Sequence, residues 1–409
     1  MVRAREAWLM IERAVSPLKT VKVQLSEALG LVLGCTVKSR VSVPPFDRAA
    51  MDGYAVRAED VEGASFDSPR ILRIVGSVEI GGDASITIGR GEAVRIDNGA
   101  PLPRGANAVV PLEYASEREL YLEVYRSVAK WENVSRKGED VSEGEGVLID
   151  GKPLEPWDLA LLRALGVEEV EVRMPRVAVI STGSELVEKP SEASGKSIVD
   201  TNRPMLVSAL RRLGCRVTLT RLVREESEES VRKVLRESVE EADLVVVTGG
   251  CSVGRKDYVA KSMKSMGDLL FHGVAIRPGM PTAAAVIEDR LVIGLPGSPV
   301  AAYVSYKLFV EQAVYRLEHR REACPPPLEA PLEVKVDSTP GFMDLVRAKV
   351  VGGKVRPVRR RGSTLLSSIS RSDGVVAVPE DYEGLKAGTY VHLYLHGQPW
   401  EGILRGEVP

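Results

Sequence analysis

The hydrophobic pattern at the start of the chain predicts an amphipathic helix over residues 2–15. Trp8, Ile11 and Val15 recur at steps of three and four residues between charged positions, and this spacing places their side chains on one face of a helix. Residues 25–34 (LSEALGLVLG) then predict a short helix that leads into an apolar strand.

A β pattern replaces the helical one after residues 41–45 (VSVPP), whose two prolines place a domain boundary near residue 43. Short apolar runs separated by Gly, Pro and Asn predict a small, mostly β domain over residues 44–135. The expected strands lie in residues 70–80, 92–96, 107–114 and 120–128.

A second helical pattern occupies residues 156–172, where leucines recur on one side. Gly166 is the expected stop of this helix, and a strand follows it. We expect this stretch to rejoin the first forty residues, so that residues 1–43 and 136–173 form one N-terminal linker domain.

Residues 174–322 alternate strands with helices. The expected strands are 176–180, 216–223 and 243–247, and the expected helices are 202–214 and 229–242. Strands separated by helices of this length form a parallel sheet with helices on both faces, a doubly wound α/β domain. Ligands of such folds bind beyond the carboxyl ends of the strands, where the loops STGSE, TGGCSVG and GLPGSP would lie.

A triple proline at residues 325–327 predicts a linker to a separate C-terminal β domain over residues 323–409. The runs that favour β structure there are 332–338, 345–351, 354–358, 374–379 and 389–395. The sequence therefore predicts a multidomain α/β protein.

The composition is that of a folded globular protein, with 44% of the 409 residues hydrophobic and 27% charged. A formal net charge of −2 gives no field of one sign, so no nucleic acid is expected as a general partner. No apolar run reaches the roughly 18 to 20 residues that cross a bilayer, so no membrane partner is expected. The four cysteines form no C-x-x-C pair, which predicts neither disulfides nor a zinc site. We expect a cytoplasmic protein.

The glycine-rich loop at residues 248–254 is a candidate anion site because it directly follows a buried strand. Its paired glycines let backbone amides approach a ligand, and the hydroxyls of Thr248 and Ser252 add donors, so a phosphate fits here. The alternative is a tight turn without a ligand. The loop is neither a Walker A motif nor GxGxxG, so the pattern alone leaves both interpretations open.

Two acids follow strands of the same domain. Glu185 lies in STGSE after the first strand, and Asp257 lies in GRKDY after the glycine loop. In a parallel sheet both lie at one edge, where paired carboxylates could hold a divalent cation against a ligand phosphate. Taken singly, each acid fits a helix cap or a solvated loop charge.

Two further loops could face an anion. Residues 275–281 place the permanent cation of Arg277 on a stiff loop that suits an oxyanion. Ser298 is the expected N-cap and Pro299 the first residue of the following helix, whose N-terminus could point at an anion. The local pattern alone favours a well-capped helix without a ligand.

Eight short segments occur in an order that carries a family resemblance. They are PPFDRAAMDGYA (44–55), IDNGAPLPRGANAVV (96–110), RKGEDV (136–141), ISTGSELV (180–187), IVDTNRPML (198–206), TGGCSVGRKDY (248–258), AIRPGMP (275–281) and GLPGSP (294–299). Singly, several would be no more than turns or solvated loops. Together they resemble the signature segments of the molybdopterin molybdenumtransferases, a family that includes the C-terminal domain of gephyrin, and the resemblance covers essentially the whole chain.

The resemblance implies a doubly wound molybdopterin-binding domain, a β-rich insert domain, an N-terminal linker domain and a C-terminal β-barrel-like domain. It implies a homodimer whose active cleft lies between the doubly wound domain of one subunit and the insert of the other. The implied reaction converts adenylylated molybdopterin and molybdate, with Mg²⁺, into molybdenum cofactor and AMP. A molybdopterin adenylyltransferase would be the upstream partner.

Site residues carry over from the family only where its motifs match. The implied catalytic carboxylates are Asp52, Asp140, Glu185 and Asp257, and the implied Mg²⁺ ligands are Asp52, Glu185 and Asp257. The implied oxyanion site for molybdate comprises Arg277, Arg347 and Ser363. The implied residues for the pterin phosphate and adenylyl group are Asn98, Thr182, Gly183, Thr248, Gly249, Gly250, Ser252, Gly254, Pro296, Gly297 and Ser298.

Several positions depart from the family pattern. Asn98 stands for the usual threonine of TGAP, and Glu225 stands where an aspartate is frequent. Arg277 stands for the first lysine of KPGKP, Met280 replaces the second, and Gly273 falls where some members have another lysine. These losses weaken the molybdate pocket as the family builds it, because one arginine fork is not equivalent to two ammonium groups.

Three other interpretations stay open. A pterin-binding or cofactor-binding scaffold would keep the fold without inserting metal, as the missing lysines suggest. A tungstate-inserting enzyme would share the motifs, because tungstate has nearly the size and charge of molybdate. A nucleotide-processing hydrolase could share the doubly wound domain, but the complete insert and C-terminal domain argue against it.

Overall fold

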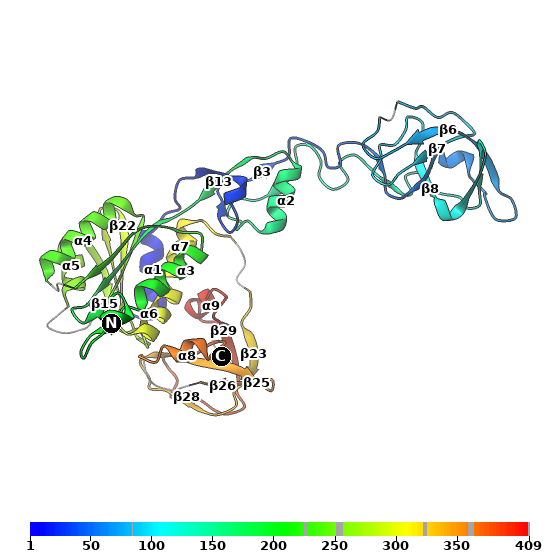
Figure 1. Ribbon diagram of the computed structural model, residues 1–409. Helices are drawn as coiled ribbons and strands as arrows, with labels where there is room; N and C mark the ends of the chain where they lie inside the picture. Colours follow the sequence, from blue (N-terminus) through cyan, green and yellow to red (C-terminus); the bar gives the residue numbers. More distant parts are fainter. Residues whose placement is uncertain (84, 225–226, 251–256, 322–324, 359–363, 408–409) are drawn as a thin grey trace. The chain divides into compact units, whose positions relative to one another are not determined.

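The computed structural model describes residues 1–83, 85–224, 227–250, 257–321, 325–358 and 364–407 (Figure 1). By its internal contacts the chain divides into two compact units. The core unit comprises residues 1–35, 150–155 and 169–409, and the insert unit comprises residues 36–149 and 156–168. The finer division into four domains remains a prediction.

A six-stranded sheet forms the centre of the core unit. Its strand order is β17 (Arg216–Val223), β14 (Arg176–Thr182), β18 (Leu244–Thr248), β22 (Arg290–Leu295), β21 (Ala283–Ile287) and β19 (Asp268–His272). The first four strands are parallel, as the alternation of strands and helices predicts. The last two pairings are antiparallel, so the sheet is mixed at that edge.

The antiparallel edge contains a hairpin that the sequence pattern does not predict. Strands β21 and β22 are joined through Glu288 and Asp289, whose φ angles are 49° and 60°. A two-residue hairpin loop with positive φ at both positions is usually signalled by Asn-Gly or Asp-Gly. Because a Glu-Asp pair carries no such signal, the hairpin escapes a pattern search.

Helices cover both faces of the sheet, which confirms the doubly wound arrangement (Figure 1). The covering helices are α3 (Asn202–Arg212), α4 (Glu228–Glu241), α5 (Tyr258–Met266) and α6 (Pro299–Ser305). Helices α3 and α6 share a core with Val177, whereas α4 and α5 share a core with its neighbour Ala178. Successive strand side chains point to opposite faces, so one apolar strand serves both cores. Among the described helices, none has the length and apolar character needed to cross a membrane.

The N-terminal residues join the core unit at two places. Helix α1 (Ala4–Ala14) buries Ala7 and Ile11 in the core that α3 also contacts. A three-stranded antiparallel sheet has the order β1 (Val21–Gln24), β13 (Glu169–Arg173) and β2 (Val32–Leu33). Strand β13 lies between the two N-terminal strands, so residues 169–173 pair with the start of the chain, while the linker domain of residues 1–43 and 136–173 remains a prediction. The helix expected in residues 25–34 is only a single 3-10 turn, Leu25–Glu27.

A long helical stretch carries a buried charge pair. Helix α6 continues through a π-helical turn into α7 (Glu311–Leu317). The side chains of Lys307 and Glu311 are each 2% exposed, and their Nζ and Oε2 atoms lie 2.5 Å apart. Lys307 Nζ also donates to the Gln398 carbonyl at 2.7 Å and lies 5.4 Å from the centroid of the Trp400 ring. These contacts tie the helix to the C-terminal residues, because an ammonium group at this burial needs partners.

The C-terminal residues form a β domain, as predicted. Its sheet has the order β20 (Ile276–Arg277), β25 (Met343–Val351), β27 (Gly374–Val378), β29 (Tyr390–Leu395) and β23 (Leu328–Pro331), with β26 (Lys354–Pro357) paired to β25. Strand β20 belongs to the Arg277 loop, so this loop supplies an edge of the C-terminal sheet. The short helices α8 (Ser367–Ser370) and α9 (Glu401–Arg405) were not predicted by the β pattern.

The insert unit is mostly β, which confirms the pattern of residues 44–135. Its main sheet has the order β8 (Ala108–Pro111), β5 (Gly53–Val56), β7 (Glu92–Ile96), β6 (Arg70–Val78), β10 (Tyr121–Val124) and β9 (Ala115–Arg118). Of these pairings only β6 with β7 is parallel. Helix α2 (Pro156–Ala164) also belongs to this unit and is followed by Gly166 at φ 75°, as predicted.

Substitution of Lys307 tests the buried charge pair. The Lys307→Met variant keeps a long side chain but leaves the Glu311 carboxylate buried without its cation, so the free energy of unfolding should fall by about 3 to 5 kcal/mol. The double variant Lys307→Met/Glu311→Leu removes both charges and should recover much of that loss. Urea unfolding followed by circular dichroism measures both. An equal loss in the double variant would show that Lys307 contributes packing and not charge compensation.

Candidate functional site

A cavity of about 530 Å³ lies at the carboxyl ends of the parallel strands of the core unit. Strands β14 and β18 are neighbours in register, with Ser181 opposite Thr248. The loops that follow them therefore meet at one edge, together with the loop after β22. The predicted site residues that line the cavity are Thr182, Glu185, Thr248, Gly249, Gly250, Pro296, Gly297 and Ser298.

The start of the glycine-rich loop is held in a conformation that requires glycine. Gly249 and Gly250 have φ angles of +89° and +63°, which L side chains rarely adopt. A Cβ at Gly249 would lie 2.2 Å from the Thr182 carbonyl oxygen. The two strand ends therefore approach each other through backbone alone. Ser252 and Gly254, predicted in the same loop, lie outside the described residues.

Asn202, the first residue of α3, organises this edge and was not among the predicted site residues. Its Nδ2 donates to Thr248 Oγ1 at 2.9 Å and to the Gly297 carbonyl at 2.8 Å. Thr248 Oγ1 in turn donates to the Pro296 carbonyl at 3.1 Å. The Thr248 hydroxyl, expected to serve a ligand, is therefore engaged inside the protein. A sequence signal existed, because Asn202 lies within the IVDTNRPML segment.

Three polar atoms at this cavity have no hydrogen-bond partner among the described residues. They are Ser181 Oγ, Thr182 Oγ1 and Asn202 Oδ1, and all three residues are buried. A buried polar group that forms no hydrogen bond costs about 1 to 3 kcal/mol. Such groups on the wall of a cavity indicate a polar ligand that would complete their hydrogen bonds.

The structure places the two predicted acids of this edge differently. Glu185 is exposed and lines the cavity. Asp257 is 7% exposed, caps α5 by accepting from Ala260 N at 3.2 Å, and lies 3.3 Å from His272 Nε2. Burial raises the pKa of Asp257, and the His272 charge opposes that shift. The helix cap that the local pattern allowed for Asp257 is therefore confirmed, and Asp257 is not among the residues that line the cavity.

The insert unit brings together two of its predicted residues. The backbone N–H of Asn98 donates to Asp52 Oδ1 at 2.8 Å. This contact follows from the pairing of β5 with β7, which sets Gly53 opposite Ile96. Asp140 lines another hollow of about 560 Å³ in the same unit, beside Arg48.

The oxyanion residues lie on two paired strands. Arg277 on β20 donates from Nε and Nη2 to the two carboxylate oxygens of Asp344 on β25, each at 2.8 Å. The fork that was expected to face an external oxyanion thus holds an internal carboxylate. Arg347, three residues along β25, is 3% exposed, and burial lowers its pKa. Ser363 lies outside the described residues.

Metal-binding capacity in the described part of the chain is limited. Within those residues no group of three or more His, Cys, Asp or Glu side chains could hold a metal ion. Glu185 is the predicted metal ligand that lines the core-unit cavity. A cation here would therefore need oxygen ligands from its substrate as well, as is usual for Mg²⁺.

Three protein families together match most of the chain. Residues 2–166 match the MoeA N-terminal region (domain I and II), and residues 178–316 match a probable molybdopterin binding domain. Residues 329–396 match the MoeA C-terminal region (domain IV). The cavity described above lies mainly in the second of these regions.

Named relatives agree along nearly the full length. The chain is 36% identical over 386 residues to a putative molybdopterin biosynthesis protein of Methanocaldococcus jannaschii, covering 92% of each. It is 32% identical over 400 residues to a molybdopterin molybdenumtransferase of Staphylococcus epidermidis, covering 96% of this chain and 95% of the relative. The solved structure of a molybdopterin biosynthesis MoeA protein from Pyrococcus horikoshii OT3 matches with a TM-score of 0.82 and 34% identity, over 96% of this chain and 100% of that chain.

The close backbone approach at Gly249 can be tested against a glycine of similar φ. Gly30 has φ +77° and its added Cβ would meet nothing within 4 Å. Gly30→Ala should cost about 1 to 2 kcal/mol of unfolding free energy from φ alone. Gly249→Ala should cost clearly more, because the Thr182 carbonyl must also move. Urea unfolding measures both, and equal losses would contradict the close approach.

Proposed function

The chain belongs to the MoeA family of molybdopterin molybdenumtransferases, enzymes of molybdenum cofactor biosynthesis, and from this premise we propose its substrates and the roles of its residues. The substrates are adenylylated molybdopterin and molybdate, the reaction depends on Mg²⁺, and the products are molybdenum cofactor and AMP. Water cleaves the phosphoanhydride bond, AMP leaves, and the freed pterin phosphate keeps its dithiolene sulfurs for the metal. A molybdopterin adenylyltransferase would supply the adenylylated substrate.

The observation that carries this proposal is the cavity wall at the strand ends, where three buried polar atoms have no hydrogen-bond partner among the described residues. Ser181 Oγ and Thr182 Oγ1 can donate to phosphate oxygens, and Asn202 Oδ1 can accept from a ring N–H or an amine. The volume of about 530 Å³ suits a nucleotide-sized ligand. Gly249 and Gly250 leave the backbone open to a phosphate, because neither has a Cβ.

The carboxylate of Glu185 fits a magnesium ligand. Mg²⁺ is usually bound through one or two carboxylates together with substrate phosphates and water, so an exposed glutamate at a phosphate-binding cavity meets the requirement. When bound, Mg²⁺ would neutralise charge on the phosphoanhydride. Asp257 is a weaker candidate ligand in this arrangement, because its carboxylate caps α5 and faces His272.

The remaining carboxylates belong to the insert unit. Asp52 is exposed and anchored by the Asn98 N–H, so its carboxylate is fixed in direction while one oxygen is left for a ligand. We propose that Asp52 and Asp140 complete the active cleft of a partner subunit in a homodimer. Sedimentation velocity would measure the oligomeric state.

Molybdate would be held near Arg277, Arg347 and Ser363. Arg277 is tied to Asp344, whose negative charge opposes the binding of a dianion. This internal pair favours one alternative, a scaffold that binds pterin without inserting metal. Tight pterin binding by calorimetry with no release of AMP would establish the scaffold. Tungstate in place of molybdate is a variant that the same assay distinguishes.

Neutralising Glu185 tests the proposed reaction. Glu185→Gln keeps the shape of the side chain but weakens metal binding, so the rate of AMP release from adenylylated molybdopterin should fall by about 10²-fold or more. Pterin affinity should change by only a few-fold. Glu240→Gln, an exposed acid on α4, is the matched control and should leave the rate unchanged. An unchanged rate in Glu185→Gln would remove Glu185 from the reaction.

The Arg277–Asp344 pair can be tested through the molybdate dependence of AMP release. Asp344→Asn keeps an acceptor for Arg277 but removes the opposing charge, so the molybdate concentration for half-maximal rate should fall several-fold. Arg277→Ala should raise that concentration. Asp381→Asn, an exposed acid of the same domain, is the control. If neither substitution changes the molybdate dependence, Arg277 lies outside the oxyanion site.

A further inference from the structure

A second cavity lies in the core unit, away from the strand-end loops. Its volume is about 480 Å³, and residues of α1, α3, α7 and the segment before α9 line it. This volume suits a small metabolite. Asn202 lines the first cavity and Arg212 lines the second, so the two lie at opposite ends of α3. Ten helical steps separate these residues by about 15 Å. Of the described residues that are assigned to the proposed reaction, none lines the second cavity.

Two guanidinium groups at this cavity remain available to a ligand. Arg212 and Arg316 line it, and neither guanidinium forms an ion pair or hydrogen bond with another residue in the described part of the chain. Arg320 also lines it but lies 3.3 Å from the Glu318 carboxylate and stacks 4.6 Å from the Tyr315 ring centroid. The cavity therefore offers two positive charges that no described carboxylate neutralises by direct contact.

The acids at the cavity leave room for an anion. Glu311 is paired with Lys307, and Glu401 lies 2.6 Å from Arg405, so a neighbouring cation compensates the charge of each carboxylate. Glu12 on α1 is half-buried and also lines the cavity. Its carboxylate can accept a hydrogen bond from a hydroxyl or amine group of a ligand. Charged groups of both signs thus face the same space.

A buried amide supplies the second, independent observation. Gln312 is 2% exposed, lines the cavity, and its Nε2 has no hydrogen-bond partner among the described residues. Gln312 and Arg316 are four residues apart on the helix, so they lie on one face. A buried donor without an acceptor is costly and rare in native proteins. An acceptor oxygen of a ligand beside Arg316 would satisfy it.

We propose that this cavity binds a small organic anion as a second ligand, distinct from the substrates of the proposed reaction. Its phosphate or carboxylate group lies between Arg212 and Arg316 and accepts from Gln312 Nε2. A hydroxyl or amine of the same molecule donates to Glu12. Charge-assisted hydrogen bonds to guanidinium groups supply most of the affinity. The site requires none of the residues that the proposed function uses.

The full-length protein can be titrated with two probes, inorganic phosphate and glycerol 3-phosphate. Trp8 lines the cavity and is one of four tryptophans, so a fluorescence change that Trp8→Phe abolishes reports occupancy of this site and not of the first cavity. A saturable change is expected with both probes, and glycerol 3-phosphate should bind more tightly because it adds hydroxyl donors. Trp8→Phe should lose the signal while calorimetry still detects binding.

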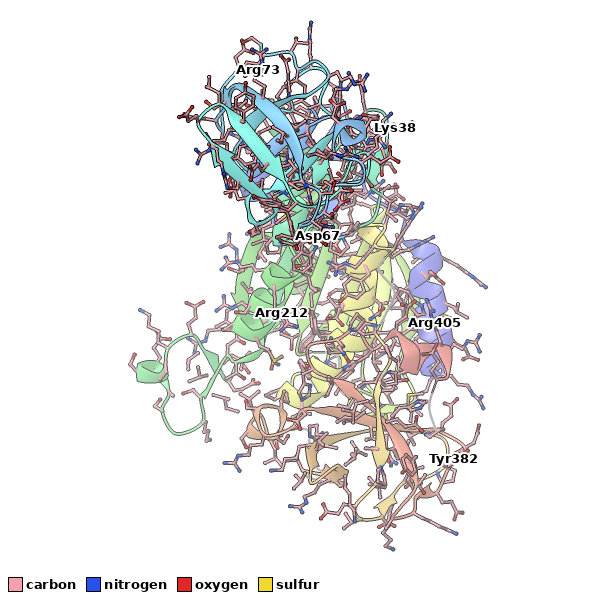
Figure 2. All side chains as sticks on the ribbon, turned by 90° about the vertical axis from the view of Figure 1, so that its right-hand side faces the viewer. Lys38, Asp67, Arg73, Arg212, Tyr382 and Arg405 are labelled. Atoms are coloured by element: carbon pink, nitrogen blue, oxygen red, sulfur yellow. The ribbon has the colours of Figure 1, made fainter. Side chains whose placement is uncertain are left out.

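Variants of exposed arginines distinguish binding at this cavity from non-specific attraction of the probes to positive charge. Arg212, which Figure 2 labels, is exposed, so Arg212→Ala leaves the core intact. Arg212→Ala and Arg316→Ala should each weaken both probes about tenfold or more, as expected when a charge-assisted hydrogen bond is lost. The neighbouring exposed Arg211 does not line the cavity, and Arg211→Ala should bind as the unsubstituted protein does. Equal affinities for Arg212→Ala and Arg211→Ala, or no saturable binding, overturn the proposal.

The buried amide gives a test that separates binding from folding. Gln312→Leu removes a buried donor that has no partner among the described residues, so it should weaken both probes while leaving the free energy of unfolding unchanged or higher. Lower stability with unchanged probe affinity would assign Gln312 a structural role and overturn its place in the site. Glu12→Ala should weaken glycerol 3-phosphate and spare inorganic phosphate. Equal losses for both probes would overturn the placement of Glu12.

Discussion

The site depends on the hydrogen bonds that the side-chain amide of Asn202 donates. Asn202 is the first residue of α3, and its Nδ2 donates to Thr248 at the end of β18 and to the Gly297 carbonyl in the loop after β22. The Thr248 hydroxyl in turn donates to the Pro296 carbonyl. The Nδ2 group of Asn202 and the hydroxyl of Thr248 therefore form hydrogen bonds within the protein. What remains for a ligand is the set of atoms that this network does not use, namely Asn202 Oδ1 and the hydroxyls of Ser181 and Thr182. Within the Asn202 side chain, Nδ2 thus stabilises the fold while Oδ1 remains for a ligand.

The parallel sheet explains why these residues meet at all. They lie far apart in the sequence, but parallel strands end at one edge, and β14 pairs with β18 so that Ser181 faces Thr248. Gly249 completes the approach because its backbone lies against the Thr182 carbonyl without a Cβ between them. The helices on the two faces bury the apolar strands, and the buried polar residues Ser181, Thr182 and Thr248 lie at the carboxyl ends of β14 and β18. A polar cavity at this edge follows from the topology before any family is considered.

Local sequence patterns predicted the helices and strands that depend on periodicity, and they missed the contacts that depend on pairing between distant residues. The strands and helices of residues 176–247 follow from alternating apolar runs, and the cap formed by Asp257 follows from its place before a helix. The pattern did not predict the hairpin turn at Glu288 and Asp289, because neither residue type usually indicates a positive φ angle. The helical pattern of residues 202–214 predicts no special role for Asn202, since its partners lie 46 and 95 positions away. The contact of Asp344 with Arg277 could not be predicted for the same reason, because only the register of β20 against β25 brings the two residues together.

That register has a chemical consequence for the oxyanion site. An arginine held by both carboxylate oxygens is fixed in position, but its charge is largely compensated, so it attracts a dianion less than a solvated lysine would. The molybdate site that we propose therefore cannot rely on a free cation at the KPGKP position, because Arg277 there already holds the Asp344 carboxylate. Arg347, on the strand that carries Asp344, is 3% exposed, and burial lowers its pKa, so neither arginine is a solvated surface cation.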